Sequence, residues 1–248
     1  MAPPSRPPPI TIPAATPPSN PAHSAAFIFL HGLGDEASGL ENIPQQFAAA
    51  GKLPHLNWLL PSALHNHDLA QAAWFMPTRL SPFPSSRPEL DDPEDDEGIN
   101  SSVAYIVSLI DEFVARGIPA NRIIVGGFSQ GCAVSMLLGL TSVYSGRLGG
   151  VAGLSGYLPL AEKVDEMRKG AGLSEKVQGG MEVFLARGTG DRLVPKRYAR
   201  MLEETIKEVG IEESKVEVKE YEGMGHVIGG GELRDLCTWL ERVLPSIH

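Results

Sequence analysis

The stretch Ile123-Ile124-Val125-Gly126-Gly127-Phe128-Ser129-Gln130-Gly131 decides the fold of this chain. It begins as an apolar run and leads into the apolar, helix-like residues 132–138, so it predicts a strand, a sharp turn and a helix, with Ser129 at the apex. Such a turn strains the serine backbone, and a side chain on Gly127 or Gly131 would collide with neighbouring backbone. The turn lifts the hydroxyl above the sheet edge, beside unpaired N–H groups at the start of the helix.

Length and charge limit the classes of protein to consider. At 248 residues the chain suits one large α/β domain. Its net charge is −9, and its sequence contains no cluster of Lys and Arg. Phosphate neutralisation needs such a cluster, so we expect no nucleic-acid partner.

The two cysteines, Cys132 and Cys237, both fall in apolar helical patterns. This argues against a disulfide framework and favours a reducing, cytoplasmic setting. No apolar run is long enough to span a bilayer, so we expect no stable membrane insertion.

The first part of the chain differs in composition from the rest. Residues 1–22 are rich in Pro with Ala, Ser and Thr, which predicts a flexible leader that packs no core. Prolines interrupt every candidate for a secretory signal, and Arg6 makes a weak organelle-targeting segment the alternative. Residues 23–248 are expected to form a single α/β domain.

Strand-like and helix-like segments alternate after the leader. Apolar or alternating runs predict strands at residues 25–30, 58–60, 123–125, 151–154, 181–186 and 216–221, the last at a sheet edge. Helical spacing predicts helices at residues 100–115, 132–138, 196–209 and 232–244, the first capped by Asn100 or Ser101. Alternation of this kind predicts a mainly parallel central sheet with helices on both faces. The acidic, Pro-rich residues 82–97 are expected to form a surface loop.

A serine hydroxyl needs a base to take its proton and an acid to orient that base. Asp191 follows the predicted strand 181–186, and His226 follows the predicted strand 216–221. The order Ser129, Asp191, His226 is the one expected for an α/β-hydrolase, so these three are the predicted catalytic residues.

Backbone N–H groups of Leu33 and Gln130 are the predicted oxyanion donors. The loop His31-Gly32-Leu33-Gly34 follows an early strand, and its glycines allow it to turn over the serine. The role belongs to the backbone, so the loop shape is expected to matter more than the two side chains. Of the other histidines, His55, His65 and His67 are assigned to loops, and no metal site or cofactor is expected.

Several segments together resemble the acyl-protein thioesterase group of the phospholipase/carboxylesterase family. They are residues 29–35, Trp74-Phe75, residues 122–131, Leu154-Ser155-Gly156-Tyr157-Leu158-Pro159, Asp191-Arg192-Leu193-Val194-Pro195 and Tyr221-Glu222-Gly223-Met224-Gly225-His226. The resemblance implies an α/β-hydrolase that cleaves long acyl chains from cysteine thioesters on proteins and needs no cofactor. It assigns the triad and the oxyanion donors to the residues named above.

Related members act on lysophospholipids or small esters, so a lysophospholipase or general carboxylesterase remains an alternative. A further alternative is a non-catalytic ligand-binding protein of the same fold. The expected partner is an acylated protein or lipid, and the sequence leaves a homodimer open.

Four positions depart from the family pattern: Cys132, Arg187, Met76 and Val227. Cys132 is expected to be a buried helix residue, not a reactive thiol. Trp74, Phe75 and Leu80 are candidates for lining an acyl groove, with a core or anchoring role as the alternative for the two aromatic residues.

Overall fold

The computed structural model describes residues 6–87 and 93–247 of the chain. The strands are β1 (Ile10–Ile12), β2 (Ala25–Leu30), β3 (Leu56–Leu60), β4 (Leu64–Asn66), β5 (Gln71–Ala73), β6 (Ile123–Phe128), β7 (Gly150–Leu154), β8 (Glu182–Gly188) and β9 (Val216–Tyr221). The α-helices are α1 (Asn42–Ala49), α2 (Asp96–Ala115), α3 (Gln130–Thr141), α4 (Val164–Gly170), α5 (Lys196–Glu208) and α6 (Gly230–Val243). Residues 1–5 of the expected leader, residues 88–92 of the acidic loop and His248 lie outside the described residues.

The central sheet has the strand order β1-β3-β2-β6-β7-β8-β9. Neighbouring strands from β3 to β9 pair in parallel, and β1 pairs antiparallel with β3. β4 and β5 form a separate antiparallel hairpin. The predicted mainly parallel sheet is therefore confirmed, and β9 is an edge strand, as its alternating sequence indicates.

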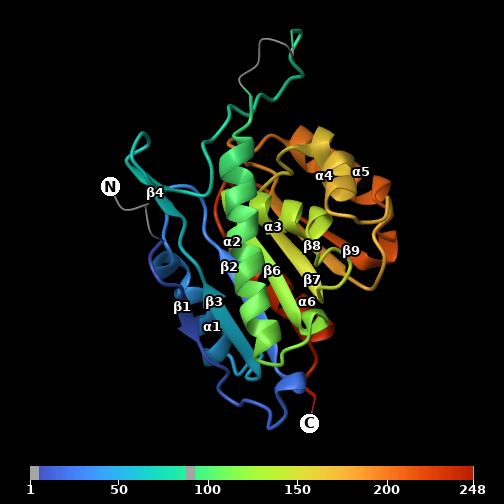
Figure 1. The fold of residues 1–248 in the computed structure, drawn as a ribbon. Helices are drawn as coiled ribbons and strands as arrows, with labels where there is room; N and C mark the ends of the chain where they lie inside the picture. The colour runs from blue at the N-terminus through green and yellow to red at the C-terminus, as the bar shows by residue number, and fades with distance from the viewer. Residues whose placement is uncertain (1–5, 88–92, 248) are drawn as a thin grey trace.

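Helices cover both faces of this sheet (Figure 1). On one face, α2, α3 and α5 bury residues such as Ile106, Leu137 and Leu202 in a large apolar cluster. On the other, α1 and α6 bury Phe47 and Trp239. The six residues of β2 are buried throughout, as expected for a strand covered on both sides.

Helix α2 begins earlier than its apolar spacing suggests. Asp95 caps it, since its carboxylate accepts a hydrogen bond from the Gly98 N–H at 2.9 Å. The expectation of a cap at Asn100 or Ser101 is therefore wrong, because the acidic first turn belongs to the helix. By length and composition α2 is apolar enough to cross a membrane, but Ile99, Ile106 and other residues of one face pack into the core.

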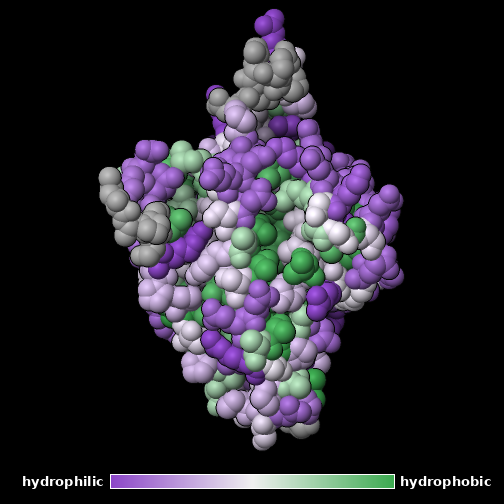
Figure 2. Space-filling model, viewed as in Figure 1, coloured by the Kyte–Doolittle hydropathy of each residue, from purple (hydrophilic) through white to green (hydrophobic). Residues whose placement is uncertain are grey.

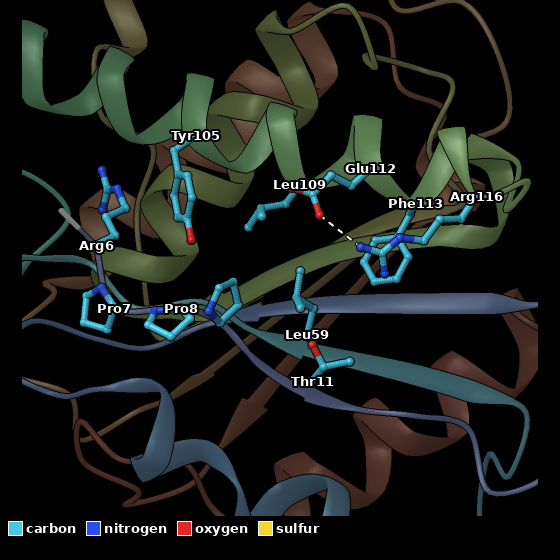
Figure 3. Close-up of a pocket in the computed structure, with 11 residues that line it drawn as sticks. Arg6, Pro7, Pro8, Thr11, Leu59, Tyr105, Leu109, Glu112, Phe113 and Arg116 are labelled. Atoms are coloured by element: carbon cyan, nitrogen blue, oxygen red, sulfur yellow. Dashed lines mark hydrogen bonds and ion pairs between the residues drawn. The ribbon is translucent and has the colours of Figure 1, made fainter.

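The N-terminal segment is part of the sheet, which corrects the expectation of a leader that packs no core. Ile10 and Ile12 alternate with the exposed Thr11 and pack against the apolar cluster beneath α1. Pro9 and Pro13 flank this short edge strand, where few ladder hydrogen bonds are needed. Figure 3 shows Arg6 beside Tyr105, and Pro7 and Pro8 across a pocket from Leu109 and Phe113 of α2.

The carboxyl ends of β2, β6, β7, β8 and β9 lie together at the top of the view in Figure 1. The loop before α2 also projects from this end. Figure 2, viewed from the same side as Figure 1, shows a mostly hydrophilic surface with hydrophobic residues gathered toward the middle of the view. In parallel sheets covered by helices, loops at the carboxyl end are where ligands bind.

Deletion of residues 1–14 is expected to lower the melting temperature, because it exposes the apolar edge strand β3 and removes two half-buried isoleucines. Loss of their burial costs on the order of 2 kcal/mol, or about 4–8 °C in a domain of this size. Differential scanning calorimetry measures the shift. Deletion of residues 1–5 alone is the control, and equal melting temperatures for the two deletions would contradict the role of β1.

A buried carboxyl group lies at the start of α6. Glu232 is fully buried, and its Oε2 accepts a hydrogen bond from the Gly229 N–H at 3.2 Å. Burial raises the pKa of Glu232 to about 7, although the hydrogen bond from Gly229 lowers it. At a pH below the pKa that Glu232 has in the unfolded chain, the carboxyl is neutral in both the folded and the unfolded state, and the folded state is then most stable. As the pH rises, the carboxyl ionises more readily in the unfolded state, so the free energy of unfolding falls until the pH has passed about 7.

Glu232→Gln is therefore expected to make stability less dependent on pH, because glutamine stays neutral. The melting temperature of the variant minus that of the wild type should increase between about pH 5 and about pH 8. Thermal unfolding in a series of buffers measures this difference. A difference that stays constant over that range would show that Glu232 is ionised in the folded protein throughout.

Candidate active site

Ser129 lies between β6 and α3 in a strained backbone conformation, with φ of 55° and ψ of −115°. The turn is held by the Ser129 N–H, which donates to the Leu154 carbonyl at 2.9 Å. A Cβ on Gly127 would lie 2.5 Å from the carbonyl carbon of Gly131 and 2.8 Å from the Leu30 oxygen. Glycine is thus required at Gly127 by close backbone packing, as the sequence pattern indicates.

The loops after β8 and β9 are joined by backbone hydrogen bonds. The Thr189 N–H donates to the Tyr221 carbonyl, and the Gly190 N–H donates to the Met224 carbonyl, both at 2.9 Å. Gly188 has no room for a Cβ, which would meet the Met224 carbonyl. This close packing brings Asp191 on one loop next to His226 on the other.

The structure brings together the three predicted side chains. His226 Nδ1 lies 2.8 Å from Asp191 Oδ2, and His226 Nε2 lies 2.9 Å from Ser129 Oγ. The Asp191 carboxylate can only accept a hydrogen bond, so the imidazole proton lies on His226 Nδ1. His226 Nε2 is therefore free to accept the proton of the serine hydroxyl. The Phe128 ring packs on the His226 ring, with 4.8 Å between the two centroids.

Asp191 is held as an ion beneath the histidine. The Asp191 side chain is 1% exposed, against 13% for His226. Its second oxygen, Oδ1, accepts from the N–H groups of Leu193 at 2.9 Å and Val194 at 3.0 Å. Burial raises the pKa of this carboxyl, but the hydrogen bonds from His226 and the two backbone groups outweigh it, and the net shift is downward.

The loop His31-Gly32-Leu33-Gly34 lies directly beside the serine. A Cβ on Gly32 would be 3.4 Å from the Ser129 Cβ. Buried His31 holds the loop in place, since its Nδ1 bonds the Gly32 carbonyl at 2.7 Å and its Nε2 accepts from the Ala63 N–H at 3.0 Å. Among the described residues, nothing accepts a hydrogen bond from the N–H of Leu33 or Gln130.

The Gln130 side chain has a role that the sequence did not reveal. Its Oε1 accepts from the Trp74 N–H at 3.1 Å, and its Nε2 donates to the Phe75 carbonyl at 2.9 Å. Trp74 Nε1 in turn donates to the His31 carbonyl at 2.8 Å. The identity of Gln130 therefore matters, contrary to our expectation, because its amide joins the turn at Ser129, which we call the elbow, to Trp74 and Phe75. The groups that it binds there are backbone groups, so no residue type in the sequence indicates this contact.

Trp74 and Phe75 are 2% and 4% exposed and belong to the core cluster, so of the two roles expected for them the core role is confirmed and the groove role is wrong. A cavity of about 460 Å³ opens above Ser129, and its residues are Gly32, Leu33, Asp35, Pro77, Thr78, Leu80, Phe128, Ser129, Gln130, Tyr157, Leu193, Val194 and His226. We call it the serine cavity. It includes Leu33 and Leu80, and apolar side chains form most of its walls.

The four departures from the family pattern lie outside the hydrogen bonds of the triad. Cys132 is buried in α3, and burial raises its pKa to about 12, as expected for an unreactive thiol. Arg187 is buried within 3.9 Å of Glu220, and the Met76 N–H donates to Asp95 at 2.7 Å. Val227 is exposed beside the histidine.

His55, His65 and His67 take no part in the hydrogen bonds that join Ser129, His226 and Asp191. His55 is buried and bonds the Leu244 carbonyl at 2.7 Å. His65 lies in β4, not in a loop as expected, and its ring is 5.5 Å from that of His67. Within residues 6–87 and 93–247, no group of three or more His, Cys, Asp or Glu side chains gathers as a metal site would require.

Comparisons with known proteins identify the family of the chain. Residues 12–244 match the phospholipase/carboxylesterase family. Acyl-protein thioesterase 1 of Yarrowia lipolytica is 35% identical over 240 residues, which cover 92% of this chain and 96% of that protein. Acyl-protein thioesterase 1 of Emericella nidulans is 31% identical over 229 residues, covering 90% of this chain and 92% of that protein.

Solved structures give the same result for the fold. Arabidopsis thaliana SOBER1 matches with a TM-score of 0.73 and 29% identity, covering 89% of this chain and 99% of that one. Zea mays acyl-protein thioesterase 2 matches with a TM-score of 0.73 and 25% identity, covering 95% and 98%. With its mainly parallel sheet, its serine elbow and a sequence match over nearly all of its length, the chain belongs to the phospholipase/carboxylesterase family of α/β-hydrolases.

Proposed function

We propose that the protein is a serine hydrolase that removes acyl groups from cysteine thioesters on proteins, with Ser129 as nucleophile, His226 as base and Asp191 as the orienting acid. The observation that carries this proposal is the hydrogen-bonded series from Asp191 through His226 to the Ser129 hydroxyl, at the floor of the serine cavity. A series of this kind activates a hydroxyl for attack on a carbonyl carbon.

In the first step, Ser129 Oγ attacks the acyl carbonyl carbon while its proton moves to His226 Nε2. Asp191 remains ionised and stabilises the imidazolium, which its lowered pKa supports. The negative charge on the carbonyl oxygen is received by the N–H groups of Leu33 and Gln130. The carbon–sulfur bond then breaks, and the proton on His226 passes to the leaving thiolate, which departs as a thiol.

In the second step, water replaces the thiol. His226 Nε2 takes a proton from water as the water oxygen attacks the acyl-enzyme carbonyl carbon. The bond to Ser129 Oγ breaks, the serine regains its proton from His226, and a fatty acid is released. No cofactor enters either step, because each proton and leaving group is accounted for by the three side chains and water.

The substrate assignment has two supports. The walls of the serine cavity are mainly apolar, which suits a long acyl chain. Relatives that cover nearly the whole chain carry the name acyl-protein thioesterase 1. We also propose a cytoplasmic setting, supported by Cys132 and Cys237, which are both unpaired and buried.

A carboxylesterase or lysophospholipase is the second candidate. The name of the matching family favours it, and its oxygen-ester chemistry uses the same residues. The non-catalytic alternative is disfavoured, because a ligand-binding protein has no need for the hydrogen bonds that join Ser129, His226 and Asp191.

Ser129→Ala is expected to lower kcat/KM for a p-nitrophenyl ester by roughly 10³-fold or more, because no other group can form the acyl-enzyme. A fluorophosphonate probe should label the wild type and leave this variant unlabelled. Ser101→Ala, at an exposed position in α2, is the control for loss of a serine hydroxyl. Near-normal hydrolysis or labelling of Ser129→Ala would exclude Ser129 as the nucleophile.

The substrate class is tested with matched palmitoyl substrates. We expect kcat/KM for a peptide palmitoylated on cysteine to exceed that for palmitoyl-lysophosphatidylcholine by about tenfold or more, because the thiol is the better leaving group and the peptide fits the proposed role. Release of palmitate is measured for both. The opposite order would replace the thioesterase proposal with the lysophospholipase alternative, while leaving the roles of the triad unchanged.

A further inference from the structure

The serine cavity has a neighbour on the side of α5. This second cavity has a volume of about 710 Å³, and its walls combine charged residues such as Arg79, Glu94 and Lys163 with apolar residues such as Leu158, Leu160 and Met201. Thr78, Leu80 and Tyr157 line both cavities. These three residues, which we call the partition, therefore separate the space above Ser129 from the space beside α5.

On one side of the partition, Arg197 and Tyr198 of α5 bind Ser81, the residue after Leu80. We call these two residues the clamp. The Ser81 carbonyl accepts from Arg197 Nε at 2.6 Å, and the Ser81 N–H donates to the Tyr198 hydroxyl at 3.2 Å. Both backbone polar groups of Ser81 are therefore bonded to α5. Because the chain is fixed on both sides of the Ser81 Cα, the backbone of Leu80 is also restrained.

Arg197 and Tyr198 support each other. Arg197 Nη2 donates to the Tyr198 hydroxyl at 2.8 Å, and the guanidinium lies 4.4 Å from the centre of the Tyr198 ring. In the described part of the chain, no carboxylate lies within ion-pair distance of Arg197. The guanidinium therefore acts on the loop and the phenol, not on an acidic partner.

The other side of the partition rests on the same clamp. The rings of Tyr157 and Tyr198 meet edge to face, with 5.9 Å between centroids. Tyr157 is buried, and Leu80 packs against the core cluster that contains Tyr157. Arg197 and Tyr198 thus support Leu80 through Ser81 and Tyr157 through its ring.

We propose that Arg197 is a positioning residue which, together with Tyr198, holds the partition closed and so limits the length of acyl chain that the enzyme accepts. This proposal rests on the proposed acyl hydrolase activity. Each methylene of an acyl chain adds binding free energy only where apolar walls surround it. A Leu80 side chain that is fixed in place blocks the chain at the partition, so further methylenes add no binding free energy. Without the clamp, the Thr78–Leu80 segment yields and the acyl chain extends along Leu158, Leu160 and Met201, the apolar residues of the second cavity.

The experiment compares kcat/KM for butyryl, octanoyl and palmitoyl p-nitrophenyl esters in the wild type and in Arg197→Ala. We expect the ratio of palmitoyl to octanoyl kcat/KM to rise about fivefold or more in the variant. Leu80→Ala should shift the ratio in the same direction. In the double variant of Arg197→Ala and Leu80→Ala, the change in the logarithm of the ratio should be smaller than the sum of the two single changes. The reason is that both substitutions open the same partition.

Arg200→Ala is the matched control, since Arg200 is an exposed arginine on the same helix with no hydrogen bond to the loop. Its ratio should equal that of the wild type. Arg197→Lys keeps the charge and one donor for the Ser81 carbonyl, so it should restore part of the wild-type ratio. If Arg197→Ala does not fold, Tyr198→Phe, which removes one hydroxyl, should shift the ratio in the same direction.

An unchanged ratio in Arg197→Ala, a fall in the ratio, or an equal loss for all chain lengths would overturn the proposal. If the wild type hydrolyses the butyryl ester and Ser129→Ala does not, the proposed function stands and only the role of Arg197 has failed. If the wild type hydrolyses none of the esters or thioesters, both proposals fall.

Discussion

The close approach of three backbone segments around Ser129 is the constraint on which the rest of the site depends. The end of β6, the start of α3 and the end of β2 meet so tightly that a Cβ on Gly127 would clash with both Gly131 and Leu30. Because Leu30 pairs with Gly127 in the parallel register, the loop that follows β2 begins beside the elbow. One contact therefore sets the strained serine next to the loop that carries Leu33.

The parallel sheet brings together the rest of the site. His226 is 97 residues from Ser129 and 35 residues from Asp191 along the chain, yet their side chains are within hydrogen-bond distance. Each follows a strand whose carboxyl end reaches the same edge. Hydrogen bonds between the loops after β8 and β9 then fix the separation of Asp191 and His226. Residues of α5, including Arg197, hold the far wall of the serine cavity through Ser81.

Prediction from the sequence succeeded where the signal was local and failed where it depended on distant backbone. The strands near Ala25–Leu30 and Gly150–Leu154 are continuous apolar runs, and the elbow has its own glycine pattern. Strand β1 was missed because its three residues are flanked by prolines, which dominate the composition of the segment, and because its pairing with β3 is a long-range contact. The sequence left Trp74 and Phe75 between a groove role and a core role, because an aromatic residue near a site has the same sequence signature whether it faces a ligand or the core.

The sequence by itself predicted the class of fold, the strand-turn-helix around Ser129 and the strand ends that carry Asp191 and His226, because glycine spacing and strand-end positions are properties of short segments. Only the tertiary structure decided that Trp74 and Phe75 are buried, that the Gln130 amide holds them, and that Leu80 stands between two cavities. The physical reason is that these contacts join side chains to backbone groups many residues away. Backbone groups are the same in every residue, so their partners cannot be read from residue types.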